Sequence, residues 1–167
     1  MRPKPGPKPR STSVTEMTEY VLPQHANVHG TVFGGQIMAW IDLCAAVCAQ
    51  RHASRPCVTA FVDEMLFKRP VLVGQVIRLR AEVTATFRTS MEIEVTVVGE
   101  NTLTAEEWPT VACFITFVAM DESGKPTPVP PLLVESASER AARAAAGKRR
   151  RGRLAKRGSR TAGASVG

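Results

Sequence analysis

GGQIMAWIDLCAAVCAQRH, residues 34–52, is the stretch that decides the fold. It contains no proline, opens on two glycines, and repeats apolar side chains at helical spacing. The repeated side chains are Ile37, Ile41, Cys44, Val47 and Cys48. A helix of ~19 residues would be ~28 Å long at 1.5 Å per residue. The stretch therefore predicts one long, almost wholly apolar helix that the rest of the chain must cover.

The segments around this helix predict strands. One extended segment, 14–22, precedes the helix, and a loop dense in turn formers, 23–31, joins the two. Four strand-like segments follow: 57–67, 75–87, 90–99 and 109–120. Apolar and polar residues alternate in the two middle segments, 75–87 and 90–99, and Arg88-Thr89 would form the turn of a hairpin between them. The pattern lacks βαβ alternation and predicts an α+β layer, in which an antiparallel sheet wraps one helix.

The positive charge lies at the two ends of the chain. Of the net charge of +7, residues 1–10 contribute +4 and residues 135–167 contribute +8, so residues 11–134 carry −5. We expect residues 1–13 to be a disordered basic arm and 14–133 to be the folded domain. Residues 134–167 form an Ala/Arg-rich low-complexity tail, helical at most in its first part.

The four cysteines show no paired framework in a chain large enough to build its own core, which favours a reducing compartment and hence the cytoplasm. The start of the chain has no apolar signal region, and no apolar run reaches the ~20 residues of a membrane span. A metal site made of Cys44, Cys48 and His52 would span ~12 Å along one helix face, too far for one zinc ion. We expect no metal.

Three features of residues 27–42 are candidates for chemistry. Asp42 is the only charge between Ile37 and Ala49, so it must pair with a cation, shift its pKa or face a cleft. Gly34 and Gly35 begin the helix with uncovered N–H groups that suit an oxyanion, although two glycines also permit a plain turn. Asn27, with His29 nearby, could position water or a carbonyl, or simply form a turn.

Taken together, these residues resemble the hotdog-fold acyl-CoA thioesterases of the cytosolic acyl-CoA and acetyl-CoA hydrolase group. The matching strings are Asn27-Val28-His29-Gly30, Phe33 to Asp42, Arg51-His52-Ala53, Val58 to Asp63, Phe67, Val73-Gly74-Gln75, Thr89 to Glu92 and Thr116 to Ala119. The resemblance covers residues 14–133 and leaves the tail aside. Many animal relatives carry two hotdogs in tandem, whereas this chain carries one.

The resemblance implies a five-stranded antiparallel sheet around one long helix, and a homodimer with shared active sites, built into a trimer of dimers. It implies Asp42 as general base or nucleophile, Asn27 acting from the partner subunit, and Gly34-Gly35 as the oxyanion contact; both roles of Asp42 are chemically sound. Coenzyme A would lie along two segments, and no further cofactor is implied. These segments are Ala60-Phe61-Val62 and Thr89-Ser90-Met91.

Several details stay open at this level. Nearby cations for the phosphates of coenzyme A are Arg51, Arg55, Lys68, Arg69 and Arg88, and candidates for the acyl tunnel wall are Met38, Trp40, Met65 and Phe67.

Two other functions remain alternatives. A hotdog hydratase or dehydratase would pair His29 with Asp42. An acyl-CoA sensor without activity would use its basic ends to bind nucleic acid, although the tail has no zinc ligands and no aromatic residue for stacking.

Overall fold

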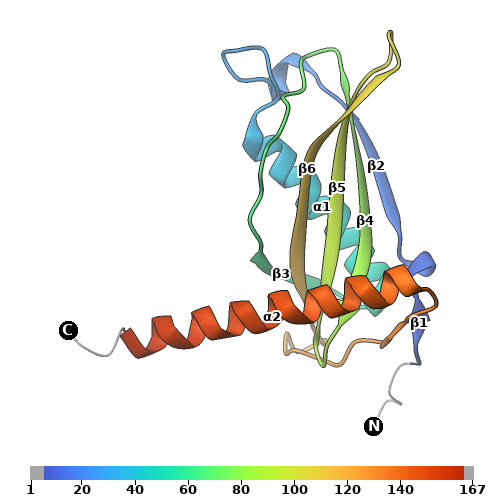
Figure 1. The fold of residues 1–167 in the computed structure, drawn as a ribbon, viewed down its shortest axis with the longest axis vertical. Coiled ribbons are helices and arrows are strands. Elements are labelled where there is room, and N and C mark those ends of the chain that lie inside the picture. Colours follow the sequence, from blue (N-terminus) through green and yellow to red (C-terminus); the bar gives the residue numbers. More distant parts are fainter. Residues whose placement is uncertain (1–5, 164–167) are drawn as a thin grey trace.

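A computed structural model describes residues 6–163, with side chains described as far as residue 156. Its centre is a five-stranded sheet in which every neighbouring pair is antiparallel, in the order β2-β4-β5-β6-β3 (Figure 1). The strands are β2 (Thr15–Tyr20), β3 (Cys57–Val62), β4 (Val76–Thr86), β5 (Ser90–Asn101) and β6 (Glu106–Ala119). The expected α+β hotdog, one sheet curled around one helix, is confirmed.

Helix α1 (Gly34–Ala53) lies in the curl of the sheet and packs against all five of its strands. It ends because Ser54 adopts a left-handed conformation at φ 51°, where its amide N donates to Gln50 O. Only one face of α1 is buried. That face carries Ile37, Trp40, Ile41, Cys44, Ala45, Cys48, Ala49, His52 and Ala53. With the inward side chains of β4, β5 and β6 they form one continuous apolar core.

The strand bounds differ from the sequence pattern at two places. β3 ends at Val62, although the apolar run continues to Phe67, because Met65 turns back onto the core while Leu66 and Phe67 stay exposed. β6 begins at Glu106 and pairs with β5 as far as Asn101, so the hairpin is longer than its apolar part. Backbone pairing continues where the side chains are already polar.

The expectation of a disordered arm is wrong for residues 8–13. Lys8–Pro9 form strand β1, which pairs in parallel with β7 (Leu132–Leu133), and Arg10–Thr12 form the 3-10 helix η1. Ser13 is buried. A second 3-10 helix, η2 (Pro23–His25), lies in the loop before α1. Residues 1–5 of the expected arm lie outside the described residues.

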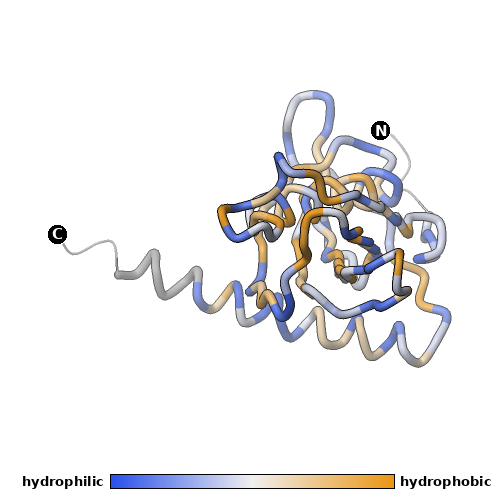
Figure 2. Tube along the Cα trace, turned by 90° about the horizontal axis from the view of Figure 1, so that it is seen from above, coloured by the Kyte–Doolittle hydropathy of each residue, from blue (hydrophilic) through white to orange (hydrophobic). Residues whose placement is uncertain are grey.

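The tail is helical well beyond the first part, where the sequence allowed a helix. Helix α2 (Ala137–Gly163) runs across the outer face of the sheet, on the side away from α1 (Figures 1 and 2). Ser136 begins it: its Oγ accepts from Glu139 N at 3.1 Å, and Glu139 Oε2 accepts from Ser136 N and Glu135 N. Residues 164–167 of the expected tail lie outside the described residues. Among the described helices, none is long and apolar enough to cross a membrane.

Candidate active site

Asp42 lies on the exposed face of α1. Its Oδ1 accepts a hydrogen bond of 2.6 Å from Thr59 Oγ1, on β3. The apolar helical neighbours in the sequence suggested a carboxylate enclosed by apolar groups. In the folded chain, the face that carries Asp42 is exposed beside the edge strand β3, so the carboxylate is open to solvent and needs no cation. Thr59, which the sequence analysis did not single out as a site residue, fixes its position.

Around Asp42 extends an apolar surface that a single chain leaves uncovered. Met38, Leu43 and Val47 of α1 are 47%, 58% and 42% exposed, and Val58, Phe61 and Val62 of β3 are 48%, 45% and 40% exposed. β3 is also the last strand of the sheet, with β6 on one side only. An apolar edge strand beside an apolar helix face is typical of a surface that associates with another chain.

The start of α1 offers free backbone N–H groups. Phe33 O accepts from Gln36 N at 2.9 Å and from Ile37 N at 3.3 Å, whereas the amides of Gly34 and Gly35 have no hydrogen-bond acceptor among the described residues. A side chain at Gly35 would meet the Phe33 ring, 2.5 Å from its Cβ. Glycine here therefore lets the aromatic ring lie against the first turn and leaves the amides to a ligand.

Asn27 is held in a compact turn before α1. Its Oδ1 accepts from His29 N at 2.9 Å, and its Nδ2 donates to Thr31 Oγ1 at 2.9 Å. Within the described part of one chain, neither Asn27 nor His29 is bonded to Asp42. The His29–Asp42 pair that a hydratase would need is thus not formed in one chain.

Helix geometry separates the helix start from Asp42. Gly35 and Asp42 are seven residues apart, so they lie on the same face of α1 but about 10 Å apart along its axis. An amide that holds the oxyanion lies about 3 Å from the carbonyl oxygen, whereas a general base reaches the carbonyl carbon directly or through one water. The free amides and the carboxylate of one chain are therefore well separated along the helix.

A pocket of about 240 Å³ lies at the helix start. Its lining includes Gly34, Phe67, Lys68 and Thr110. Of the four tunnel candidates, Phe67 lies at this pocket and Met38 is on the exposed helix face, whereas Trp40 is buried and packs edge-on against His25 at 5.0 Å. Trp40 is therefore a core residue in the single chain.

The two segments expected to bind coenzyme A lie near the same end of the sheet. Ser90 pairs with Val118 of β6, which pairs with Val58 of β3. Ala60, Phe61 and Val62 are exposed on β3. Thr89 and Ser90 are half-buried, and Met91 is fully buried, which leaves only its backbone for a ligand.

Two of the five expected phosphate cations already have partners. Arg51 Nη1 donates to Val14 O and Thr15 Oγ1, at 3.1 and 3.0 Å. Arg69 pairs with Glu106 at 2.8 Å and stacks on Trp108. Both side chains tie separate segments together, which accounts for them without a ligand.

Sequence analysis missed the cations of α2. Glu92, fully buried on β5, accepts from Arg149 Nη2 at 2.7 Å and from Arg153 Nη1 at 3.2 Å. Arg153 also pairs with Asp63 at 2.7 Å. Burial raises the pKa of the Asp63 carboxyl, and the Arg153 charge opposes that rise. In the sequence, Glu92 lies on the polar side of the alternating pattern of β5, together with Glu94, so it reads as a solvent-exposed carboxylate and gives no signal of the helix that covers it.

The three potential metal ligands on α1 make other contacts. Burial raises the pKa of the Cys44 thiol to about 11 and that of Cys48 to about 12, and His52 Nε2 lies 3.0 Å from Pro130 O. Within residues 6–163, no group of three or more His, Cys, Asp or Glu side chains is arranged to hold a metal ion.

Comparison with known proteins gives consistent matches. Residues 29–106 match the family model of the Thioesterase superfamily. The chain is 39% identical to the Bacillus subtilis protein named Uncharacterized acyl-CoA thioester hydrolase YkhA, over 73% of this chain and 71% of that protein. It is also 39% identical to mouse Acyl-coenzyme A thioesterase 11, over 70% of this chain and 20% of that protein. The chain thus spans about a fifth of that relative's length.

Solved structures agree over nearly the whole fold. A structure described as an apo-hexameric acyl-CoA thioesterase superposes with a TM-score of 0.87 at 41% identity, over 90% of this chain and 97% of that one. The acyl-CoA hydrolase of Staphylococcus aureus, solved with butyryl coenzyme A and coenzyme A, superposes with a TM-score of 0.84 at 33% identity, over 92% of this chain and 94% of that one. The chain belongs to the thioesterase superfamily, and within it to the hotdog-fold acyl-CoA thioesterases.

Proposed function

We propose that the protein hydrolyses acyl-CoA thioesters to a free carboxylic acid and coenzyme A. The observation that carries this proposal is the Asp42 carboxylate, oriented by Thr59 on an exposed helix face whose other end offers two free backbone N–H groups. Acyl transfer to water requires two parts: a carboxylate that activates the water, and amide N–H groups that donate hydrogen bonds to the oxyanion.

The reaction begins at the thioester carbonyl carbon. As a general base, Asp42 takes a proton from water, the oxygen bonds to that carbon, and the Gly35 amide holds the oxyanion. The C–S bond then breaks, and the thiolate of coenzyme A takes up a proton. As a nucleophile, the same carboxylate would form an anhydride that water hydrolyses. Thr59 holds the carboxylate in position in either route.

We further propose that each site is shared by two chains. The axial distance of about 10 Å between Gly35 and Asp42 supports this. Two α1 helices packed antiparallel, crossing near Met38 and Ala39, would set the helix start and Asn27 of one chain beside Asp42 of the other. The exposed apolar residues of α1 and β3 would be covered in the same contact.

The solved relatives are in keeping with this assignment. Structures of the Staphylococcus aureus hydrolase include alanine variants of one aspartate, one threonine and one asparagine. The same three residue types occur here as Asp42, Thr59 and Asn27. Two solved relatives are described as hexameric, and we propose a homodimer that assembles further, as a trimer of dimers. Cytoplasmic location stays a prediction from the cysteines.

The test measures release of free coenzyme A from acetyl-, butyryl-, octanoyl- and palmitoyl-CoA. Asp42→Asn is expected to lower kcat by about 10²- to 10⁴-fold. The matched control is Glu19→Gln, the same loss of a carboxylate at a half-buried position of β2, at the opposite edge of the sheet from β3. Wild-type protein that adds water to crotonyl-CoA without releasing thiol would instead support the hydratase. Binding of acyl-CoA without either reaction would support the sensor.

Mixing two inactive variants tests the shared site. Asp42→Asn and Asn27→Ala chains, unfolded and refolded together, would form mixed dimers with one intact site, so about a quarter of the wild-type activity should return by random assortment. Each variant refolded alone gives the baseline. If activity stays at that baseline while mixed dimers form, the two residues do not act across a chain boundary.

A further inference from the structure

Helix α2 carries two sets of cations with different surroundings. One set points at the sheet: Arg149 and Arg153 pair with the buried Glu92, and Arg150 stacks over the Phe87 ring at 4.5 Å. These contacts hold α2 on the outer face of the sheet. The second set, Arg140, Arg143, Lys148 and Arg151, has none of these partners.

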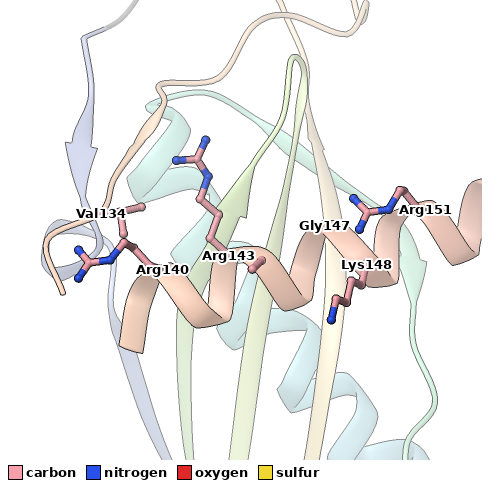
Figure 3. A pocket seen from close by; sticks show the side chains of 7 residues that line it. Val134, Arg140, Arg143, Gly147, Lys148 and Arg151 are labelled. Atoms are coloured by element: carbon pink, nitrogen blue, oxygen red, sulfur yellow. The ribbon is translucent and has the colours of Figure 1, made fainter. Parts of the chain in front are cut away.

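The second set lines a groove along one side of α2 (Figure 3). The groove has a volume of about 560 Å³, and its lining is Val134, Arg140, Arg143, Ala144, Gly147, Lys148 and Arg151. These helix positions recur every three or four residues and so follow one side of α2. Small residues at 144 and 147 leave room between the long cations.

The groove has no counter-charge of its own. Its lining holds four cations and no acidic residue. Among the described residues, none of the four is in an ion pair with a carboxylate. Four like charges around one hollow repel one another, and an anion bound between them removes that repulsion. The geometry therefore suits a ligand with several phosphate groups, to which arginine donates in pairs.

Helix α2 reaches both segments expected to contact coenzyme A, through cations that neighbour the groove but do not line it. Arg150 ties α2 to Phe87, next to the turn at Thr89. Further along α2, the guanidinium carbon of Arg153 lies 5.6 Å from the centre of the Phe61 ring on β3. Asp42, through its bond to Thr59, is joined to the same strand. A substrate whose thioester reaches Asp42 would thus have its far end close to α2.

We propose that this groove binds the phosphate groups of the nucleotide end of coenzyme A, its diphosphate and its 3′-phosphate. The proposal rests on the proposed function and assigns a role to the Arg-rich tail. The buried ion pairs of Glu92 hold α2 in place, and the fixed helix presents its free cations to the substrate. The volume of about 560 Å³ fits a nucleotide, since ligand pockets run to several hundred Å³.

The test compares two substrates that differ only in the nucleotide. Butyryl-CoA carries the phosphates, and butyryl-pantetheine does not. Arg143→Gln/Arg151→Gln is expected to raise KM for butyryl-CoA about tenfold and to leave kcat/KM for butyryl-pantetheine unchanged. The control is Arg78→Gln/Arg80→Gln, which removes the same charge from β4, where both guanidiniums are paired with carboxylates. Added salt should shrink the difference between variant and wild type.

A second measurement does not depend on catalysis. Calorimetric titration with adenosine 3′,5′-bisphosphate should show binding to wild-type protein and weaker binding to Arg143→Gln/Arg151→Gln. If the protein hydrolyses neither substrate but still binds this nucleotide through the two arginines, the proposed function fails and the groove stands. An equal loss for both substrates, no loss, or binding of a single-stranded oligonucleotide in preference to the nucleotide each overturns the assignment.

Discussion

Replacing Glu92 with alanine should loosen α2 and destabilise the fold. Glu92 is fully buried and accepts hydrogen bonds from Thr84 Oγ1, Arg149 and Arg153, at 2.8, 2.7 and 3.2 Å. Removing one partner of a buried ion pair costs about 3–5 kcal/mol. The side chains of Arg149 and Arg153 are 27% and 12% exposed, so water can reach them, and we expect the lower end, about 3 kcal/mol.

This loss corresponds to a fall in Tm of roughly 6–12 °C, at 2–4 °C per kcal/mol for a domain of this size. Thermal unfolding followed by circular dichroism measures it, and limited trypsin digestion reports whether the arginines of α2 become accessible. Glu100→Ala, which removes an exposed pair with Arg78, should lower Tm by less than about 4 °C. A Glu92→Ala protein with unchanged Tm and a trypsin-resistant α2 would refute the role of the buried pairs.

Four further outcomes follow from named contacts. Thr59→Val should lower kcat and leave Tm within about 2 °C, because it removes only the bond that orients Asp42; equal kcat in a stopped-flow assay would contradict this. Burial, and then the Glu82 charge, raise the pKa of the Glu94 carboxyl, so the fold loses stability as pH rises through the raised pKa. In chemical denaturation, Glu94→Gln should therefore stabilise the protein at pH 7 by less than about 1 kcal/mol, and should have no effect below pH 4.5. Gly99→Ala would place a Cβ 2.5 Å from the buried Trp108 indole and should cost about 1–3 kcal/mol in the same measurement. Burial raises the pKa of the Cys113 thiol to about 12, so in native protein this thiol should react with a thiol reagent at pH 8 far more slowly than after unfolding.

The sequence alone determined the central helix, the five strands of the sheet and the family. Apolar residues at helical spacing over 34–52 and at alternating spacing in β4 and β5 record which faces are buried, and burial is the main term that selects a fold. The Asn27, Gly34-Gly35 and Asp42 order was readable for a related reason. A charge or a glycine pair that packing does not require stands out against an apolar helix.

Only the tertiary structure decided how these residues are grouped. Residues 8–13 read as disordered by composition, yet Ser13 is fully buried, and Lys8 and Pro9 of β1 pair in parallel with β7, which lies 124 residues further along the chain. The tail read as low complexity, and its arginines gain meaning only from the buried Glu92 on a distant strand. Local sequence sets the period of each element, but contacts between elements depend on distances in space that no local pattern records.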